Sequence, residues 1–318
     1  MQKLSNDGME RLLMFDLYFA ATQGKNSIQY RVDFNSNILL SWILDRKSID
    51  YLVELKRSKK YNGKLFIDSG AFTAHRKDTI IDTDKYIDFL NERDDVLDLY
   101  AQVDSIPGKF GQVRTKEDIK IATKLSKDNY LYMVNKVKSS EKLLPVFHQD
   151  ESFSHLDWML NLKVNNNLIP YIGISGAKDR SVELRFNWYL EVFEHIYNSN
   201  NPKVKTHAFG TSSINHLVQY PFTSSDSTSW LQTAANGGVI CKYGVIKLSD
   251  RTLSDPDNIF NSPALEKFSL YTKDLGYNIE DLKTDYELRS KFNIEFLDTW
   301  SKNYKYKGLK NFKRSKLF

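Results

Sequence analysis

Three aspartates each follow a short apolar run that is typical of a β-strand. Asp68 ends the run KLFID, Asp104 ends VLDLYAQVD, and Asp226 ends YPFTSSD. In each case residues that favour strands stop, and a carboxylate opens a polar stretch that favours a turn. In a barrel of parallel strands, the loops that follow the strands converge at one end, where catalytic groups are placed. Three carboxylates in this setting predict one shared site for acid–base or nucleophilic chemistry.

Other strand ends add polar groups and glycines that suit a neutral, planar ligand. These residues are Ser69, Gly70, His148, Gln149, Gly173, Gly176 and His207. A carboxylate accepts hydrogen bonds from the N–H groups of a purine-like base, and an amide or glycine N–H donates to its ring carbonyl. Structural roles stay open, because Asp68 and Asp226 could instead cap the helices that follow them. His148 could likewise be a packed, hydrogen-bonded histidine.

Eight apolar runs predict the framework that positions these residues. They span 12–20, 64–68, 96–104, 143–149, 168–175, 204–210, 220–226 and 237–246. Stretches with helical periodicity lie between them, and strand–helix alternation predicts a parallel sheet with helices outside. Eight strands favour a closed (β/α)8 barrel, the TIM barrel of the α/β class, over an open doubly wound sheet.

The remaining segments predict additions to this barrel. Residues 21–63 form a long connection after the first strand, and their apolar run NILLSWIL predicts an inserted hairpin or helix. From about residue 255 the pattern becomes helical. We therefore expect a catalytic barrel over residues 1–250 and a helical extension with a basic tail over 251–318.

Composition narrows the class of protein. Hydrophobic residues make up 41% of the chain and aromatic residues 13%, which argues against wholesale disorder. No apolar run approaches the roughly 20 residues that span a membrane, and the N-terminus lacks the pattern of a signal peptide, so we expect a cytoplasmic protein. The single cysteine, Cys241, lies in an apolar run that predicts a buried thiol. Because histidines also lack metal-binding spacings, we expect neither a metal site nor a cofactor.

Positive charge is concentrated at the C-terminal end. The last 17 residues contain seven cations and no acid: Lys302, Lys305, Lys307, Lys310, Lys313, Arg314 and Lys316. Tyr304, Tyr306 and Phe312 alternate with them, a pattern that suits phosphate contact combined with base stacking. The tail is thus a candidate nucleic-acid-binding segment, although a solvated, lysine-rich end is the alternative.

Taken in order, the strand-end motifs resemble those of the tRNA-guanine transglycosylase superfamily. FIDSGAF resembles that family's DSGGF segment, AQVD and VFHQ resemble its base-contacting strands, and YIGISG resembles its glycine-rich strand. FTSSDSTSW carries an aspartate where the family keeps its nucleophile. The resemblance covers residues 64–241, and the family fold is a TIM barrel.

The resemblance implies a pentosyltransferase that exchanges bases. Asp226 would attack C1′ of a guanosine and expel guanine, and a 7-deazaguanine would displace the resulting ester with overall retention. Asp68 would manage the proton of the leaving and entering bases, while Asp104 and Gln149 would read the base. The implied substrate-binding set is Ser69, Gly70, Asp104, His148, Gln149, Gly173, Gly176 and His207. The target nucleotide must be turned out of any base stack to reach such a pocket.

Three departures separate this chain from the tRNA-acting members. It lacks a Cys/His zinc site, it has SerThrSerTrp at 227–230 in place of a Pro-Thr-Arg stretch, and Ala71 replaces the second glycine of DSGGF. These departures favour the zinc-free phage and bacterial relatives that insert 7-deazaguanines into DNA. The expected partners are DNA and a free base such as preQ0, in the host cytoplasm if the protein is phage-encoded. The alternatives are a tRNA-directed enzyme, a nucleoside or nucleic-acid glycosidase that uses water, and a non-catalytic nucleic-acid-binding barrel.

Overall fold

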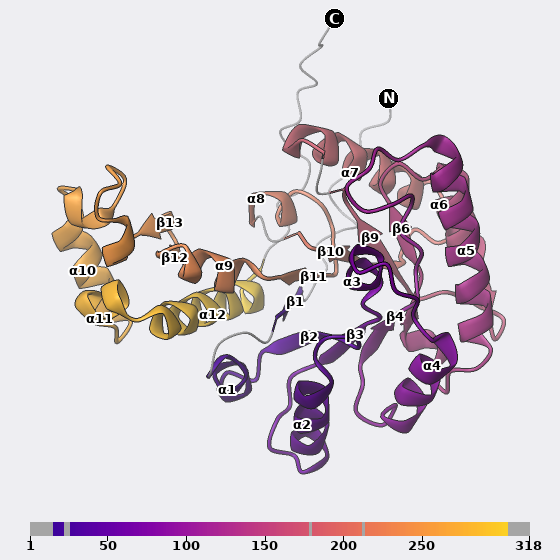
Figure 1. Ribbon diagram of the computed structural model, residues 1–318, viewed down its shortest axis with the longest axis horizontal. Helices are drawn as coiled ribbons and strands as arrows, with labels where there is room; N and C mark the ends of the chain where they lie inside the picture. The colour runs from indigo at the N-terminus through magenta and orange to yellow at the C-terminus, as the bar shows by residue number, and fades with distance from the viewer. Residues whose placement is uncertain (1–14, 22–25, 178–179, 212–213, 305–318) are drawn as a thin grey trace, which may run out of the picture.

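A curled sheet of parallel strands forms the centre of the computed structural model, which describes residues 15–21, 26–177, 180–211 and 214–304 (Figure 1). The strands of this sheet are β1 (Asp16–Phe19), β2 (Asn37–Ser41), β3 (Leu65–Asp68), β4 (Leu99–Ala101), β5 (Leu143–Leu144), β6 (Val146–His148), β9 (Tyr171–Ser175), β10 (Lys205–Phe209) and β11 (Ser224–Ser227). Their spatial order is β5-β4-β3-β2-β1-β11-β10-β9-β6, and every pairing is parallel.

Residues 143–148 bring the two ends of this order together. β5 pairs with β4 and β6 pairs with β9, and Pro145 separates the two short strands. Proline has no N–H to donate to a ladder, but the carbonyl of Pro145 accepts a hydrogen bond from the Gly173 N–H at 2.8 Å. The sheet is therefore a nearly closed barrel with eight strand positions, which confirms the predicted α/β TIM-like fold.

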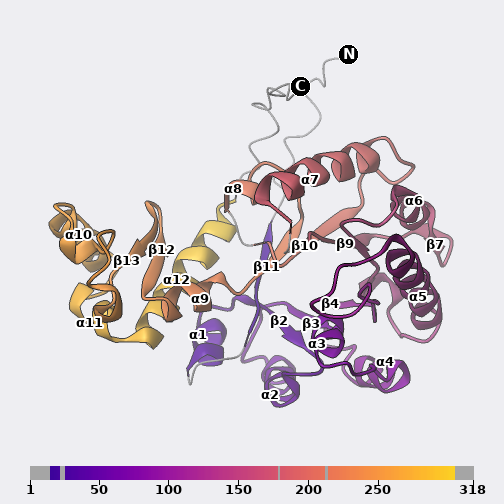
Figure 2. The same cartoon turned by 45° about the horizontal axis from the view of Figure 1, so that its top comes forward.

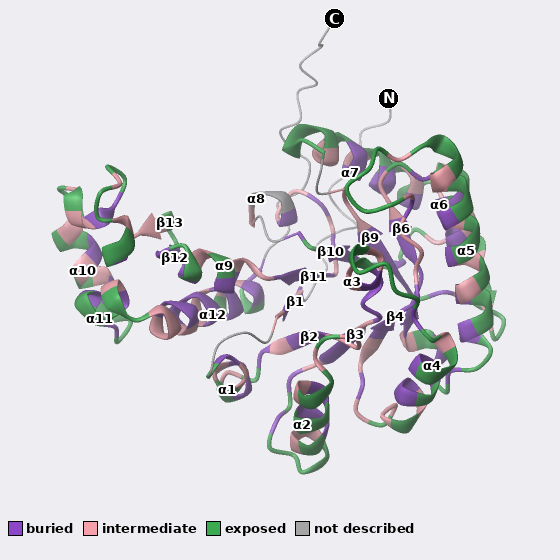
Figure 3. Ribbon diagram, viewed as in Figure 1, coloured by how far each residue is buried: buried purple, intermediate pink, exposed green. Residues whose placement is uncertain are grey.

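Helices surround the barrel (Figure 2). They are α1 (Ser27–Asp33), α2 (Arg46–Arg57), α3 (Ala71–Arg76), α4 (Thr83–Glu92), α5 (Lys116–Val134), α6 (Phe153–Asn161), α7 (Val182–Tyr197), α8 (Ile214–Leu217) and α9 (Ser229–Ala235). α4 shows why they lie there, because it buries Tyr86 and Leu90 against the sheet and exposes Asp88. Figure 3 shows the same division along the molecule, with buried strands and exposed outer helix faces.

The second barrel strand comes from the segment that the sequence pattern assigned to an insertion. β2 pairs with both β1 and β3 in parallel, so residues 37–41 belong to the barrel. The prediction of an inserted hairpin or helix over residues 21–63 was wrong for this run. Its residues Ile38 and Leu40 are fully buried, as expected for a strand covered on both faces.

The run 237–246 was predicted to be the eighth barrel strand and is instead an antiparallel hairpin outside the barrel. Its strands are β12 (Gly238–Cys241) and β13 (Gly244–Lys247), and Cys241 pairs with Gly244 across the turn. A connection of two residues can only return the chain antiparallel, whereas parallel strands need a long crossover. Asp226 therefore lies in the last strand of the barrel.

The hairpin packs with the C-terminal helices α10 (Leu265–Asp274), α11 (Ile279–Thr284) and α12 (Tyr286–Lys302). Val239, Leu248, Phe268, Leu282 and Phe292 belong to one apolar core, which thus joins residues on both sides of residue 250. Figure 1 shows this lobe beside the barrel, with α12 running back toward β1. A small hairpin, β7 (Lys163–Val164) and β8 (Asn167–Leu168), and short 3-10 segments at 140–142, 250–252 and 259–261 complete the described elements.

Most of the basic tail lies outside the described residues; of its seven cations, Lys302 is described. Lys302 pairs with Asp298 at 2.5 Å. Tyr304 is buried, stacks on Phe15 at 4.5 Å and donates its hydroxyl to the Leu217 carbonyl at 2.6 Å. The proposed base-stacking role is therefore wrong for Tyr304, because its ring is already packed. Within the described segments, no helix has the length and apolar character required to cross a membrane.

Candidate active site

A cavity of about 790 Å³ lies at the C-terminal end of the barrel strands. Asp68, Asp104 and Asp226 all line it, so the structure brings the three strand-end aspartates together. They come from β3, the segment after β4, and β11. This end of a parallel barrel is where the following loops meet, which is the reason the sequence pattern could place them.

Asp226 faces the cavity because β11 alternates its side chains between the two faces of the sheet. Ser224 and Asp226 lie on the inner face, while the Ser225 hydroxyl donates outward to the Ala208 carbonyl at 3.0 Å. The Gly210 N–H donates to Oδ1 of Asp226 at 2.6 Å, and Oδ2 has no hydrogen-bond partner among the described residues. Thr228, not Asp226, is the N-cap residue of α9, so the capping alternative was wrong for Asp226.

A buried histidine lies behind Asp226. His207 Nε2 is 3.4 Å from Asp226 Oδ1, and His207 Nδ1 is 2.6 Å from the Ser224 hydroxyl, which is 2.8 Å from the Tyr171 hydroxyl. Burial lowers the pKa of His207 although Asp226 opposes the change, so the imidazole is neutral. A chain in which Tyr171 donates to Ser224 and Ser224 donates to Nδ1 leaves the proton on Nε2, facing Asp226.

Asp68 is the carboxylate whose proton affinity is most changed. Burial and the charges of Asp104 and Asp226 raise its pKa from 3.8 to about 7, although a hydrogen bond from the Gly70 N–H at 3.1 Å favours the charged form. That hydrogen bond closes a turn. The N-cap residue of α3 is Gly70 and no side chain caps this helix, so the capping alternative was also wrong for Asp68. Gly70 has φ +86°, and a Cβ there would lie 2.9 Å from Ile43 Cγ1, so this turn requires glycine.

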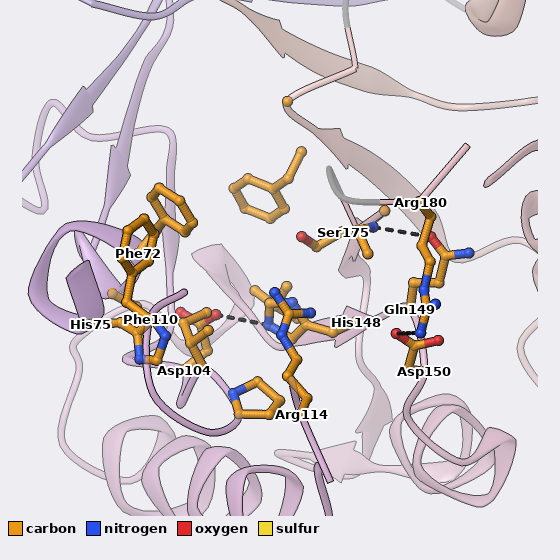
Figure 4. A pocket seen from close by; sticks show the side chains of 18 of the residues that line it. Phe72, His75, Asp104, Phe110, Arg114, His148, Gln149, Asp150, Ser175 and Arg180 are labelled. Atoms are coloured by element: carbon orange, nitrogen blue, oxygen red, sulfur yellow. Dashed lines mark hydrogen bonds and ion pairs between the residues drawn. The ribbon is translucent and has the colours of Figure 1, made fainter. Parts of the chain in front are cut away.

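Asp104 and His148 form a pair at the cavity wall (Figure 4). Asp104 Oδ2 is 2.8 Å from His148 Nε2. Burial disfavours the charged imidazole, but the hydrogen bond and the charge of Asp104 outweigh it and raise the pKa of His148. The buried carboxylate of Glu151 accepts the His148 backbone N–H at 2.9 Å and lies 3.1 Å from His155 Nδ1. His148 thus lines the cavity and is held in place by the carboxylate of Glu151, which the sequence pattern did not single out.

Gln149 lines the cavity, but its side-chain amide oxygen is already hydrogen-bonded to the protein backbone. Its Oε1 accepts the Ala177 N–H at 3.0 Å, which ties β6 to the segment after β9 (Figure 4). Gly176 also lines the cavity. The other residues expected to bind substrate lie behind the cavity wall: Ser69, Gly70, Gly173 and His207.

Gly173 nevertheless shapes the cavity through a neighbour. A Cβ at this position would lie 2.4 Å from Cε2 of Phe209, which itself lines the cavity. The absence of a side chain at Gly173 therefore lets the Phe209 ring lie against β9.

The sequence pattern missed a group of aromatic and cationic residues at the cavity. Phe72 from α3 and Phe110 from the segment before α5 are both about half exposed and lie 6.2 Å apart in an edge-to-face arrangement. Lys109, Arg114 and Arg180 also line the cavity, so it is richer in cations than the strand ends indicated. None of these residues ends a strand; the only local signal is the run KFGQVR between the turn at Gly108 and the next helix.

No family model matches this sequence, and no curated protein sequence matches it. Among the residues that the structure describes, no group of three or more His, Cys, Asp or Glu side chains is arranged to hold a metal ion. The chemistry of the site therefore has to be argued from its own geometry.

Proposed function

We propose that this protein is a base-exchange glycosyltransferase that replaces guanine in DNA by a 7-deazaguanine, working in the cytoplasm. The observation that carries the proposal is one cavity with three carboxylates in three different environments. Asp68 has a pKa raised to about 7, Asp104 is bonded to His148, and Asp226 accepts the Gly210 N–H through Oδ1. Environments that separate the proton affinities of neighbouring acids are typical of sites with a distinct acid and nucleophile.

In the first step, Asp226 Oδ2 attacks C1′ of the target nucleotide and the C1′–N9 bond breaks. The bond's electron pair goes to guanine, which takes the proton of Asp68 and leaves as the neutral base. The Gly210 N–H donates to Oδ1 and His207 Nε2 lies 3.4 Å from the same oxygen, an arrangement that would present Oδ2 to the reacting carbon. The product of this step is an ester between Asp226 and the sugar.

In the second step, the incoming 7-deazaguanine loses its N9 proton to the Asp68 carboxylate and attacks C1′. Asp226 leaves as a carboxylate, Asp68 regains its proton, and the configuration at C1′ is that of the starting nucleotide. A pKa near 7 suits Asp68 to both steps, because both protonation states are populated near neutral pH.

The base would be read by the wall that holds Asp104 and His148. Asp104 accepts hydrogen bonds from ring N–H and exocyclic amine groups, and the imidazolium of His148 supplies a donor at the same wall. Phe209 and Phe72 line the cavity and offer apolar surface to the faces of a planar base.

The test is guanine exchange followed by trapping of the ester. Single-stranded DNA, duplex DNA and tRNA are each incubated with labelled guanine and one of three proteins: the wild type, Asp226→Asn, or Asp88→Asn. Asp88→Asn is the matched control, on the exposed face of α4. We expect label to enter DNA with the wild type and Asp88→Asn, and exchange to fall by a factor of 1,000 or more with Asp226→Asn, as for loss of a nucleophile.

Mass spectrometry of the protein after incubation with DNA alone should show a sugar adduct that Asp226→Asn lacks. Label that enters tRNA but not DNA would identify tRNA as the substrate in place of DNA. Release of guanine without incorporation of label would indicate a glycosidase that uses water. Wild-type protein that neither exchanges nor releases guanine would exclude the proposed reaction.

A further inference from the structure

Arg114, one of the cations that line the cavity, has no acidic partner among the described residues. Arg114 lines the cavity and lies beside Asp104 and His148 in Figure 4. In the part of the chain that the structure describes, no carboxylate lies within ion-pair distance of its guanidinium. A guanidinium facing a cavity with its five N–H donors unshared is well suited to bind an oxyanion.

The carboxylates near Arg114 are already occupied. Asp104 is bonded to His148 at 2.8 Å. Asp118 caps α5, because it accepts the Thr115 N–H at 2.8 Å and the Thr115 hydroxyl at 2.7 Å. Asp150, on the far side of the cavity, lies 3.1 Å from Arg180. Among the described residues, these carboxylates are therefore bonded elsewhere and none of them pairs with Arg114.

Arg114 also lies near histidines whose positive charge would repel its guanidinium when no anion is bound. Arg114 lies beside His148 in Figure 4; burial and the charge of Arg114 lower the pKa of His75, and the same charge opposes the raised pKa of His148. His148 is bonded to Asp104, which favours the imidazolium form next to this second cation. An anion bound between Arg114 and His148 would relieve the repulsion between the two cations.

The segment that carries Arg114 brings further groups suited to a nucleotide. Lys109 lines the same cavity from this segment, and the Phe110 ring is about half exposed beside Phe72. A cation next to exposed aromatic rings is the combination that binds a phosphate together with an unstacked base.

We infer that Arg114, supported by Lys109, forms an oxyanion subsite that holds a phosphate of the nucleotide whose base enters the cavity. The inference rests on the proposed function for the identity of the base but not for the presence of the anion. A phosphate there would fix the flipped nucleotide by its backbone, while the carboxylates of the cavity act on its sugar and base. Arginine can bind phosphate through two parallel hydrogen bonds, which also orients it.

The test measures binding of a labelled short single-stranded DNA with a central guanine, over a series of salt concentrations and without an incoming base. Arg114→Gln is compared with Arg251→Gln, a matched control at an exposed arginine of the C-terminal lobe. We expect Arg114→Gln to weaken binding roughly tenfold or more, as for loss of a charge-assisted hydrogen bond. The slope of log affinity against log salt should fall by about 0.7, the share of one phosphate on a single strand. Arg114→Lys keeps the charge but not the fork, and should give an intermediate loss.

Two further ligands distinguish the source of the phosphate. Deoxyguanosine and its 5′-monophosphate are titrated separately into the wild type and Arg114→Gln. If the monophosphate binds more tightly than the nucleoside only when Arg114 is present, the subsite holds the nucleotide's own 5′-phosphate. If only the strand depends on Arg114, it holds a flanking phosphodiester. Either result supports the subsite.

The inference is overturned if Arg114→Gln has the same affinity and salt slope as Arg251→Gln. Exchange activity is scored independently, so the two ideas can fail separately. Arg114-dependent binding by a protein that exchanges no guanine would leave the subsite standing and reject the proposed reaction. Guanine exchange by the wild type, together with unchanged DNA binding in Arg114→Gln, would leave the proposed reaction standing and reject the subsite.

Discussion

Replacing Asp68 by asparagine should stabilise the folded protein at neutral pH while removing a proton carrier from the cavity. The pKa of Asp68 is raised from 3.8 to about 7 by burial and by the charges of Asp104 and Asp226. Between these two values the folded protein holds a proton that the unfolded chain has released, so the free energy of unfolding falls as pH rises through this window. The loss is complete above about pH 7 and amounts to up to about 4 kcal/mol, at about 1.4 kcal/mol per pKa unit.

Asparagine has the shape of the protonated acid and carries no charge, so Asp68→Asn avoids this loss. Its advantage over the wild type in free energy of unfolding should therefore grow with pH, by about 2–3 kcal/mol between pH 5 and pH 8. Urea unfolding at both pH values measures this difference, because the free energy falls linearly with denaturant. Asp88→Asn, at an exposed position of α4, is the matched control and should show no such growth.

The pH dependence of the exchange rate gives a second, independent measure of the ionisation of Asp68. The wild-type rate should depend on an ionisation near pH 7, and Asp68→Asn should be slower and lack that ionisation. An Asp68→Asn protein whose stability advantage is the same at pH 5 and pH 8 would show that Asp68 is not protonated in the fold. In that case its assignment as the proton carrier would also have to be abandoned.

Two further substitutions test the supports of the cavity. His207→Phe keeps a buried ring but removes the Nε2 group that lies 3.4 Å from Asp226 Oδ1, so ester formation should slow roughly tenfold with little change in affinity for DNA. The rate of adduct formation in a single turnover measures this effect. An unchanged rate would reject the positioning role of His207. Gly173→Ala places a Cβ 2.4 Å from the Phe209 ring and should push that ring into the cavity, weakening binding of free guanine by calorimetry. Unaltered guanine affinity in Gly173→Ala would mean that the ring has room to move elsewhere.

Local sequence pattern was sufficient to place the three aspartates because each lies at a sharp boundary between apolar and polar residues. It was not sufficient to decide which apolar runs form the barrel. Residues 37–41 and 237–246 look alike in hydrophobicity, and only their pairing separates them: β2 has parallel neighbours on both sides, whereas β12 turns back on itself after two residues. The glycine at the turn, Gly244 with φ +99°, was the local signal for a hairpin.

Contacts between distant parts of the chain were harder to predict than strand ends. The link from Tyr171 through Ser224 to His207 joins three different strands, and no spacing within any one of them indicates it. Arg114 precedes a helix and follows a turn, so its place beside His148 depends on how residues 105–115 cross the end of the barrel. Sequence pattern therefore predicted the acidic groups of the cavity and missed its cations, Lys109, Arg114 and Arg180.

In the proposed reaction, the surroundings of the three carboxylates would allow an acidic cavity to accept a polyanion. Asp68 is largely protonated below about pH 7, and Asp104 is bonded to an imidazole whose pKa is raised. Asp226 accepts the Gly210 N–H through Oδ1, and its neighbour His207 is neutral because burial lowers its pKa. A strand that approached this cavity would meet far less negative charge than three aspartates would carry together, and it would meet the guanidinium of Arg114, which has no carboxylate partner among the described residues. The same burial that prepares Asp68 to give its proton to a departing base also lowers the electrostatic barrier to the phosphates that accompany that base.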